Sequence, residues 1–145
     1  MSQTVKVTVT KRFTVPAERV YDAWLDPQMI GRWMFGPNVR DESIVRLGTE
    51  PRVGGKFSFV VKRGESEIDH LGEYLELERP RRLVFTWTTR DSLPETSRVI
   101  ITIAAQDNGC ELTLTHEMGS AWAPYSERTR HGWTRMLDVL AGVFG

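Results

Sequence analysis

Six strand-like segments follow one another with only short turns between them, and this run constrains the fold more than any other feature of the chain. Residues with a strong turn preference separate most of the segments, and Asn108-Gly109 predicts a hairpin because this pair readily adopts positive φ. Strands joined so tightly must pair in antiparallel fashion. The predicted strands run from Asp41 to Leu47, Gly55 to Lys62, Glu67 to Leu77, Arg82 to Thr88, Thr96 to Ala105 and Cys110 to His116.

The segment before this run adds a seventh strand and two short helices. Residues 4–13 alternate polar and apolar side chains, which is typical of a half-buried strand. The sequence VPAE at residues 15–18 predicts a helix start, and Asp26 is the predicted N-cap of a second helix that begins with proline. Helices this short are not stable alone. We therefore expect Trp24 and Trp33, one from each helix, to anchor the pair to the sheet.

The last segment changes the apolar period from two residues to that of a helix. A single apolar stripe predicts one long helix that begins between Ser120 and Ser126. A twisted sheet of seven strands curls, and a long helix in its concave face would cover that face. We therefore predict an α+β fold as a single domain over residues 1–145. The stripe consists of Trp133, Met136, Leu137, Leu140 and Phe144.

Composition and charge exclude several partner classes. The chain has 19 lysines and arginines against 19 aspartates and glutamates, so no net field attracts nucleic acid. The single cysteine, Cys110, can form neither an internal disulfide nor a Cys-x-x-Cys metal set, which fits a reducing compartment. The chain offers no signal-peptide core and no apolar run long enough to span a membrane. We expect a cytoplasmic protein with no membrane insertion, no metal and no cofactor.

Four stretches of sequence together resemble a known family over nearly the whole chain. These are VPAERVYDAWLDPQMIGRW, VGGKF, HLGEYLELERPRRLVFTW and GWTRMLDVLAGVF. In their order and spacing they resemble the activator of heat-shock-protein-90 ATPase homologue family of the START/Bet v 1-like (SRPBCC) superfamily. The resemblance implies a helix-grip fold, in which a seven-stranded antiparallel sheet wraps around the C-terminal helix. It also implies an apolar cavity between helix and sheet that holds a hydrophobic molecule. Because a fold does not determine a function, the family name alone does not establish a chaperone partner.

Aromatic residues supply most of the candidate ligand-binding positions. Each is also a candidate for ordinary core, because large aromatic side chains dominate the interiors of small domains. Alternation places Phe57 and Phe59 on one face of their strand and Phe85 and Trp87 on one face of theirs. Trp133 is expected to face them from the helix. The predicted cavity-lining apolar residues are Trp33, Phe35, Phe57, Phe59, Phe85, Trp87, Trp133 and Leu137.

Three polar side chains complete the candidate site. His70 and Tyr74 share one face of their strand, and His116 shares parity with the leucines around it. A satisfied structural role and a role in orienting a ligand both remain open for the two histidines. The neighbouring Asp69 points to the opposite face from His70, so the two do not form a dyad. Leu71, Leu75 and Leu77 have the opposite parity to His70 and Tyr74, and a β-bulge near Gly72 would reconcile the two sets.

Tests for common catalytic motifs fail, so no catalytic residues are assigned. The chain lacks Gly-x-Ser-x-Gly, His-Glu-x-x-His and Gly-x-Gly-x-x-Gly sequences. The leading hypothesis is binding of a hydrophobic or amphipathic small molecule without chemistry. A second is a cofactor-independent enzyme, similar to a polyketide cyclase or dehydratase, in which His70, His116 or Tyr74 moves a proton. A third is a chaperone-accessory or regulatory interaction module, for which a homodimer through an exposed sheet edge or an apolar patch is one form and a solitary monomer would be evidence against it.

Overall fold

A computed structural model describes residues 4–144 and contains one seven-stranded antiparallel sheet with three α-helices. The strands are arranged in the order β1-β7-β6-β5-β4-β3-β2, so β1 and β2 form the two edges. The two short 3₁₀ turns are η1 (Arg90–Ser92) and η2 (Ser120–Tyr125). The other elements are β1 (Thr4–Phe13), α1 (Ala17–Ala23), α2 (Pro27–Trp33), β2 (Ser43–Thr49), β3 (Lys56–Arg63), β4 (Ser66–Glu78), β5 (Arg82–Thr89), β6 (Ser97–Gln106), β7 (Gly109–Gly119) and α3 (Ser126–Phe144).

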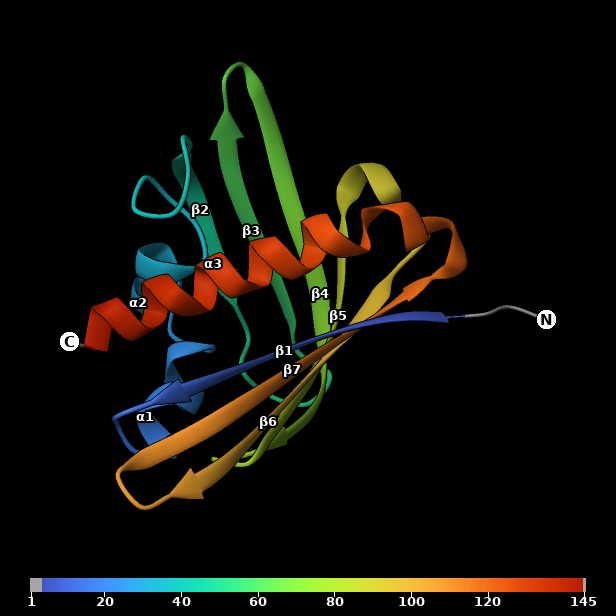
Figure 1. Ribbon diagram of the computed structural model, residues 1–145. Coiled ribbons are helices and arrows are strands. Elements are labelled where there is room, and N and C mark those ends of the chain that lie inside the picture. Colours follow the sequence, from blue (N-terminus) through green and yellow to red (C-terminus); the bar gives the residue numbers. More distant parts are fainter. Residues whose placement is uncertain (1–3, 145) are drawn as a thin grey trace.

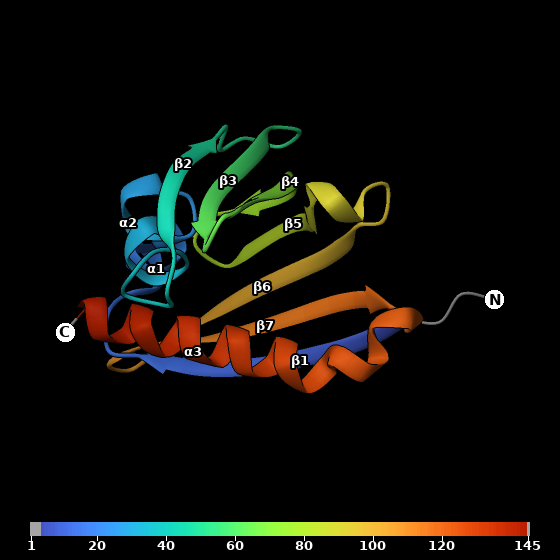
Figure 2. The ribbon, with the colours of Figure 1, turned by 90° about the horizontal axis from the view of Figure 1, so that it is seen from above.

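The sheet curls, and α3 runs across its concave face (Figure 1). Seen from above, β2, β3 and β4 bend away from β1 and β7, and α1 and α2 lie near the C-terminal end of α3 (Figure 2). This is the helix-grip arrangement that the resemblance implies, and it confirms the predicted α+β fold. The predicted start of the last helix is also confirmed, because η2 leads into α3 at Ser126. None of the described helices combines the length and apolar character that a bilayer crossing requires.

The two short helices are anchored as the sequence predicts. The Asp26 side chain accepts a hydrogen bond of 3.0 Å from the backbone N–H of Gln28 and so caps α2. Trp24, at the end of α1, and Trp33, at the end of α2, pack edge to face with ring centroids 4.6 Å apart. The indole N–H of Trp33 donates to the Ala23 carbonyl at 3.0 Å. This pair of buried rings ties each helix to the other and both to the sheet.

The bulge in β4 is present, but the predicted position near Gly72 is wrong. The pairing of β4 with β5 shifts register between Tyr74 and Glu76, which puts the irregularity at Leu75. Tyr74 therefore stays buried, while Leu77 packs against the core after the bulge. Gly72 serves a different purpose: a Cβ there would overlap the Phe57 ring and the carbonyl oxygen of the opposite strand. The glycine leaves room for the aromatic ring to lie over the strand.

Candidate functional site

A cleft of about 720 Å³ opens between the N-terminal half of α3 and the sheet. This cleft, called the α3 cleft below, lies within the range of volumes typical of ligand sites. Its walls come from the α2–β2 loop, β3, β4, the ends of β5 and β7, the start of β6, both 3₁₀ turns and α3. The lining residues are Phe35, Arg40, Arg63, His70, Trp87, Thr88, Thr89, Ser92, Glu95, Thr96, Ser97, His116, Met118, Gly119, Ser120, Ala121, Trp122, Arg128, Thr129, Gly132, Trp133 and Met136.

The structure separates the eleven sequence-predicted site residues into two groups. All of them are largely removed from solvent, but only the first group lines the α3 cleft. That group is Phe35, His70, Trp87, His116 and Trp133. The second group is packed in the core next to it and consists of Trp33, Phe57, Phe59, Tyr74, Phe85 and Leu137.

Stacked aromatic rings form the inner wall of the α3 cleft. Trp87 on β5 lies between Trp133 on α3, at 5.5 Å between ring centroids, and Phe35 of the α2–β2 loop, at 6.3 Å. Behind them, Phe57 packs against Trp87 at 5.9 Å and against Phe59 at 4.7 Å. The volume next to the cleft is therefore filled by rings. The open space of the cleft lies toward the N-terminal half of α3.

His116 is held in a continuous chain of hydrogen bonds that fixes its tautomer. The Trp133 indole N–H donates to Nδ1 of His116 at 3.1 Å, so Nδ1 must be an unprotonated acceptor. Nε2 then carries the proton and donates to the Ser97 hydroxyl at 2.7 Å, which in turn donates to the Trp87 carbonyl at 2.8 Å. Burial lowers the pKa of His116 to about 4. Because both ring nitrogens are engaged, His116 has no free atom with which to move a proton.

His70 differs, because one of its ring nitrogens is available to the cleft. Nδ1 lies 3.1 Å from the Phe59 carbonyl oxygen, which can only accept, so Nδ1 carries the proton. Burial lowers the pKa of His70 to about 4, although the bond to the Phe59 carbonyl opposes this. Within residues 4–144, Nε2 has no hydrogen-bond partner and is not sealed from solvent. His70 therefore presents a neutral acceptor to a bound molecule.

Tyr74, the third polar candidate, lies outside the cleft. Its hydroxyl hydrogen-bonds to the Thr49 hydroxyl, and its ring packs on Phe57. Burial raises the pKa of Tyr74, which keeps the phenol neutral. Of the three groups considered for proton transfer, only His70 has an accessible and unoccupied atom.

A buried ion cluster beside His70 was missed by sequence reasoning. Glu42, whose side chain is 0% exposed, accepts from Arg63 Nε at 2.6 Å and from Arg40 Nη1 at 3.0 Å. It also accepts from the backbone N–H of Gly36 at 2.8 Å. Burial raises the pKa of Glu42, but these hydrogen bonds and the two positive charges outweigh it and leave the pKa lowered.

One member of this cluster carried a signal in the sequence. Arg63 has the same parity on β3 as Phe57 and Phe59, so alternation alone places it on the inner face. The predicted strand nevertheless ends one residue earlier, at Lys62, because Gly64 is typical of a turn. Glu42 precedes β2 in a loop, where no periodic pattern indicates which side chains are buried. Gly132, the residue that keeps one helix turn of the cleft open, was likewise not predicted.

Replacing Glu42 with glutamine is expected to lower the free energy of unfolding by about 2 to 3 kcal/mol. The change leaves two guanidinium groups without their shared carboxylate, although both arginines keep some contact with water, which reduces the loss. Chemical denaturation followed by circular dichroism measures the difference. The exposed pair Arg52 and Glu50 provides the control, because Glu50→Gln should change stability by less than about 0.5 kcal/mol. Equal losses for the two variants would contradict the buried role of Glu42.

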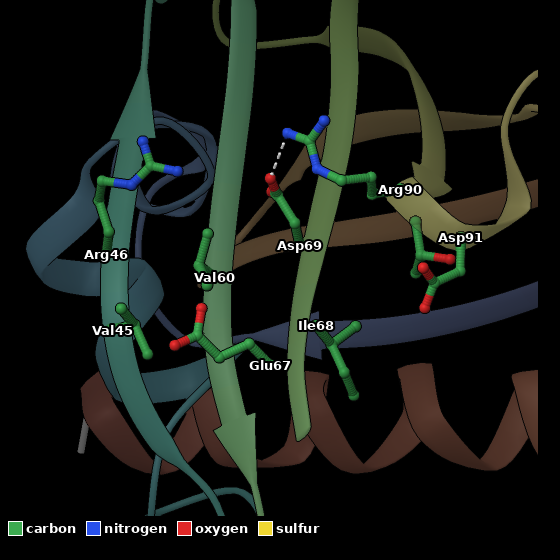
Figure 3. A pocket seen from close by; sticks show the side chains of 9 residues that line it. Val45, Arg46, Val60, Glu67, Ile68, Asp69, Arg90 and Asp91 are labelled. Carbon is green, nitrogen blue, oxygen red and sulfur yellow. Dashed lines mark hydrogen bonds and ion pairs between the residues drawn. The ribbon is translucent and has the colours of Figure 1, made fainter. Parts of the chain in front are cut away.

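A second hollow lies on the opposite face of the sheet, with α3 behind the strands (Figure 3). Asp69 on β4 accepts from Arg90 at 2.8 Å and from Ser58 at 2.6 Å there. This confirms that Asp69 and its neighbour His70 point to opposite faces. The hollow is smaller, at about 320 Å³, and its floor is mixed in polarity. Within residues 4–144, no three His, Cys, Asp or Glu side chains come together as a metal site would require.

Comparisons with known proteins agree with this architecture. A family model described as activator of Hsp90 ATPase homolog 1-like protein matches residues 14–145. The chain is similar to a solved protein from Chromobacterium violaceum, at 26% identity and a TM-score of 0.83 with 95% of each chain covered. It is also similar to an HSP90 activator from Plasmodium falciparum, at 26% identity and a TM-score of 0.74 over 97% of this chain and 96% of that one. A comparison with curated protein sequences finds no match.

Proposed function

Because the chain belongs to the activator of Hsp90 ATPase homolog 1-like family, we propose that it uses the α3 cleft to bind a hydrophobic or amphipathic small molecule. The observation that carries the proposal is the cleft itself, a space of about 720 Å³ against the rings of Phe35, Trp87 and Trp133. Such a combination of apolar rings with a few polar groups is the usual composition of a ligand pocket. The five predicted residues that line the cleft are the proposed ligand contacts.

A steric block within α3 tests the proposal. Gly132 lines the cleft, and a Cβ added there meets no atom within 4 Å. Gly132→Phe should therefore fold normally, place its ring in the cleft and reduce ligand affinity by at least about tenfold. The measurement is a screen of lipids, aromatic polyketides and hormones by native mass spectrometry and thermal shift, repeated on the variant with each molecule that binds.

The same helix supplies a matched control for this block. Gly142 lies on α3 outside the cleft lining, and a Cβ there also meets no atom within 4 Å. Gly142→Phe introduces the same ring on the same helix and should leave affinity within about twofold of the starting protein. Unchanged binding in Gly132→Phe, or equal losses in both variants, would place the ligand outside the α3 cleft. Failure of every molecule in the screen to bind would remove the proposed function.

A second candidate function is regulation of an Hsp90-type chaperone. It is supported by the family description and by the similarity to the HSP90 activator from Plasmodium falciparum. The test is the ATPase rate of an Hsp90 protein from the same organism, with and without this chain. A rate that does not change at saturating concentration, together with no co-sedimentation, would exclude this candidate.

The cofactor-independent enzyme is the weaker alternative. It depends on His70, because His116 has both nitrogens engaged and Tyr74 lies outside the cleft. A bound molecule that is released chemically unchanged by the intact protein would argue against it.

Three broader expectations stay predictions. The chain should fold as a single domain, and a truncation at either end should unfold it as one unit. A reducing cytoplasmic location fits Cys110, which is buried and unpaired. A homodimer would use the open edge of β2, where Val45 is 51% exposed, and sedimentation over a range of concentrations measures it.

A further inference from the structure

The charged groups of the α3 cleft are not balanced. Among the described residues, three arginines line it, Arg40, Arg63 and Arg128, but only one carboxylate does, that of Glu95. The chain as a whole has no net charge, so this excess is local. A cleft with one sign of charge and apolar walls concentrates ligands of the opposite charge.

Two of these arginines share a single carboxylate, which leaves one positive charge in excess. Glu42 binds both Arg40 and Arg63, and both of its oxygens are occupied by these contacts and by the Gly36 N–H. A third guanidinium, that of Arg135, binds the nearby Val39 carbonyl. Burial lowers the pKa of Arg40; Glu42 opposes this, while the neighbouring positive charges add to it. Among residues 4–144, this group therefore holds a partly desolvated cation for which Glu42 is the one ion-paired carboxylate.

Both arginines of this pair line the cleft and keep free donors. Arg63 uses only Nε on Glu42, and within residues 4–144 its two terminal nitrogens have no partner. Arg40 uses only Nη1, on Glu42 and on the Met34 carbonyl. Its guanidinium carbon lies 5.8 Å from the centroid of the Phe35 ring, which in turn lies 4.6 Å from the His70 ring. The free guanidinium donors and the aromatic wall thus belong to one side of the cleft.

We infer that the α3 cleft selects amphipathic anions, with the anionic head group bound by Arg63 and Arg40 and the apolar body lying on Trp87 and Trp133. The inference deepens the proposed ligand-binding function and rests on it. Guanidinium groups bind carboxylate and phosphate oxygens through paired, charge-assisted hydrogen bonds, so either head group satisfies the site. Around Trp122, the described lining residues include no second pair of arginines on one carboxylate, so this part of the cleft would admit the end of the apolar body.

Three probes with the same ring system distinguish the contribution of the head group to affinity from that of the apolar body. They are naphthylacetate, naphthyl phosphate and the uncharged naphthylethanol. Isothermal titration calorimetry at pH 7 should give at least one anion an affinity about tenfold higher than that of the alcohol. Whichever anion binds more tightly identifies the head group. In Arg63→Met, that advantage should fall to about twofold or less, while the affinity for naphthylethanol should change by less than twofold.

Two further variants test whether the effect on anion affinity is specific to the Arg63 guanidinium. Arg128→Met removes a cation from the opposite wall and should lower anion affinity by less than about threefold. Arg63→Lys keeps the charge but loses the planar pair of donors. Its affinity advantage for the anion over the alcohol should therefore lie between those of the original protein and Arg63→Met. Circular dichroism confirms that each variant is folded, and Arg63→Lys provides the comparison if Arg63→Met is not.

The possible failures are distinguishable. Equal affinity for the alcohol and both anions would overturn the inference and leave cleft binding intact. Equal losses in Arg63→Met and Arg128→Met would also overturn it, because they would indicate general electrostatic attraction. If none of the three probes binds, the inference fails, and the wider screen described above decides the proposed function separately.

Discussion

Replacing Trp133 with alanine is expected to lower the free energy of unfolding by about 3 to 5 kcal/mol, as the loss of a large buried ring does elsewhere. The side chain is 3% exposed, and its ring contacts Trp24 at 5.9 Å and Trp87 at 5.5 Å between centroids. Its indole N–H also donates to Nδ1 of His116. The alanine variant loses both kinds of contact and leaves a buried acceptor without its donor.

Trp133→Phe separates the two contributions. Phenylalanine keeps most of the ring contact but has no N–H for His116, so the expected loss is about 1 to 2 kcal/mol. Urea denaturation followed by far-ultraviolet circular dichroism is the appropriate measurement, because the substitution itself changes tryptophan fluorescence. A change of less than about 1 kcal/mol in Trp133→Ala, together with lost ligand binding, would mean that Trp133 lies on an open wall and not in a packed interior.

The helices and strands of this fold were predicted well, because each depends on residues that are near one another in the sequence. Alternation and short turns define β3 to β7, and the Asp26 cap and its following proline define α2. The pairing of β1 with β7 is not a local property of the sequence, since it joins residues as distant as Val7 and His116. Within β4, the bulge could not be positioned from parity, because its place depends on the partner strand and on how Phe57 lies over Gly72.

The candidate site was predictable only in part, and for a related reason. Parity indicated that His116 faces inward and that Phe85 and Trp87 share one face, and His70, His116 and Trp87 all line the cleft. It could not distinguish a ring beside empty space from a ring beside another ring, so Phe57 was predicted to line the cavity together with Trp87. That distinction depends on where packing stops. Here space remains beside Gly132 of α3, where an added Cβ would meet no atom within 4 Å.

Acidification from pH 7 to pH 5 is expected to lower the free energy of unfolding by about 4 kcal/mol, or about 2 kcal/mol for each buried histidine. Burial lowers the pKa of both His70 and His116 to about 4, whereas an unfolded histidine titrates near pH 6.5. Between these values, the unfolded chain binds protons that the folded chain does not. The stabilising contribution is therefore fully present above about pH 6.5 and is lost as the pH falls toward about 4.

Buried carboxylates lose their contribution in a lower pH window, which allows the two effects to be separated. The pKa of Glu42 is lowered by its hydrogen bonds and by the two arginines, despite burial. Its contribution is therefore present above the ordinary glutamate value of about 4.3 and is lost below it. A decrease in stability between pH 6.5 and 5 belongs to the histidines, and one below about pH 4 includes Glu42.

Single and double glutamine variants assign the decrease to each ring. Glutamine does not titrate, so His70→Gln and His116→Gln should each remove about half of the change between pH 7 and 5, and the double variant should remove nearly all of it. The exposed His131 supplies the matched variant His131→Gln, which controls for the introduction of a glutamine itself. Denaturant midpoints at four pH values between 5 and 7.5 measure the effect. Full pH dependence in the double variant would show that other groups carry it, whereas its loss would assign it to His70 and His116.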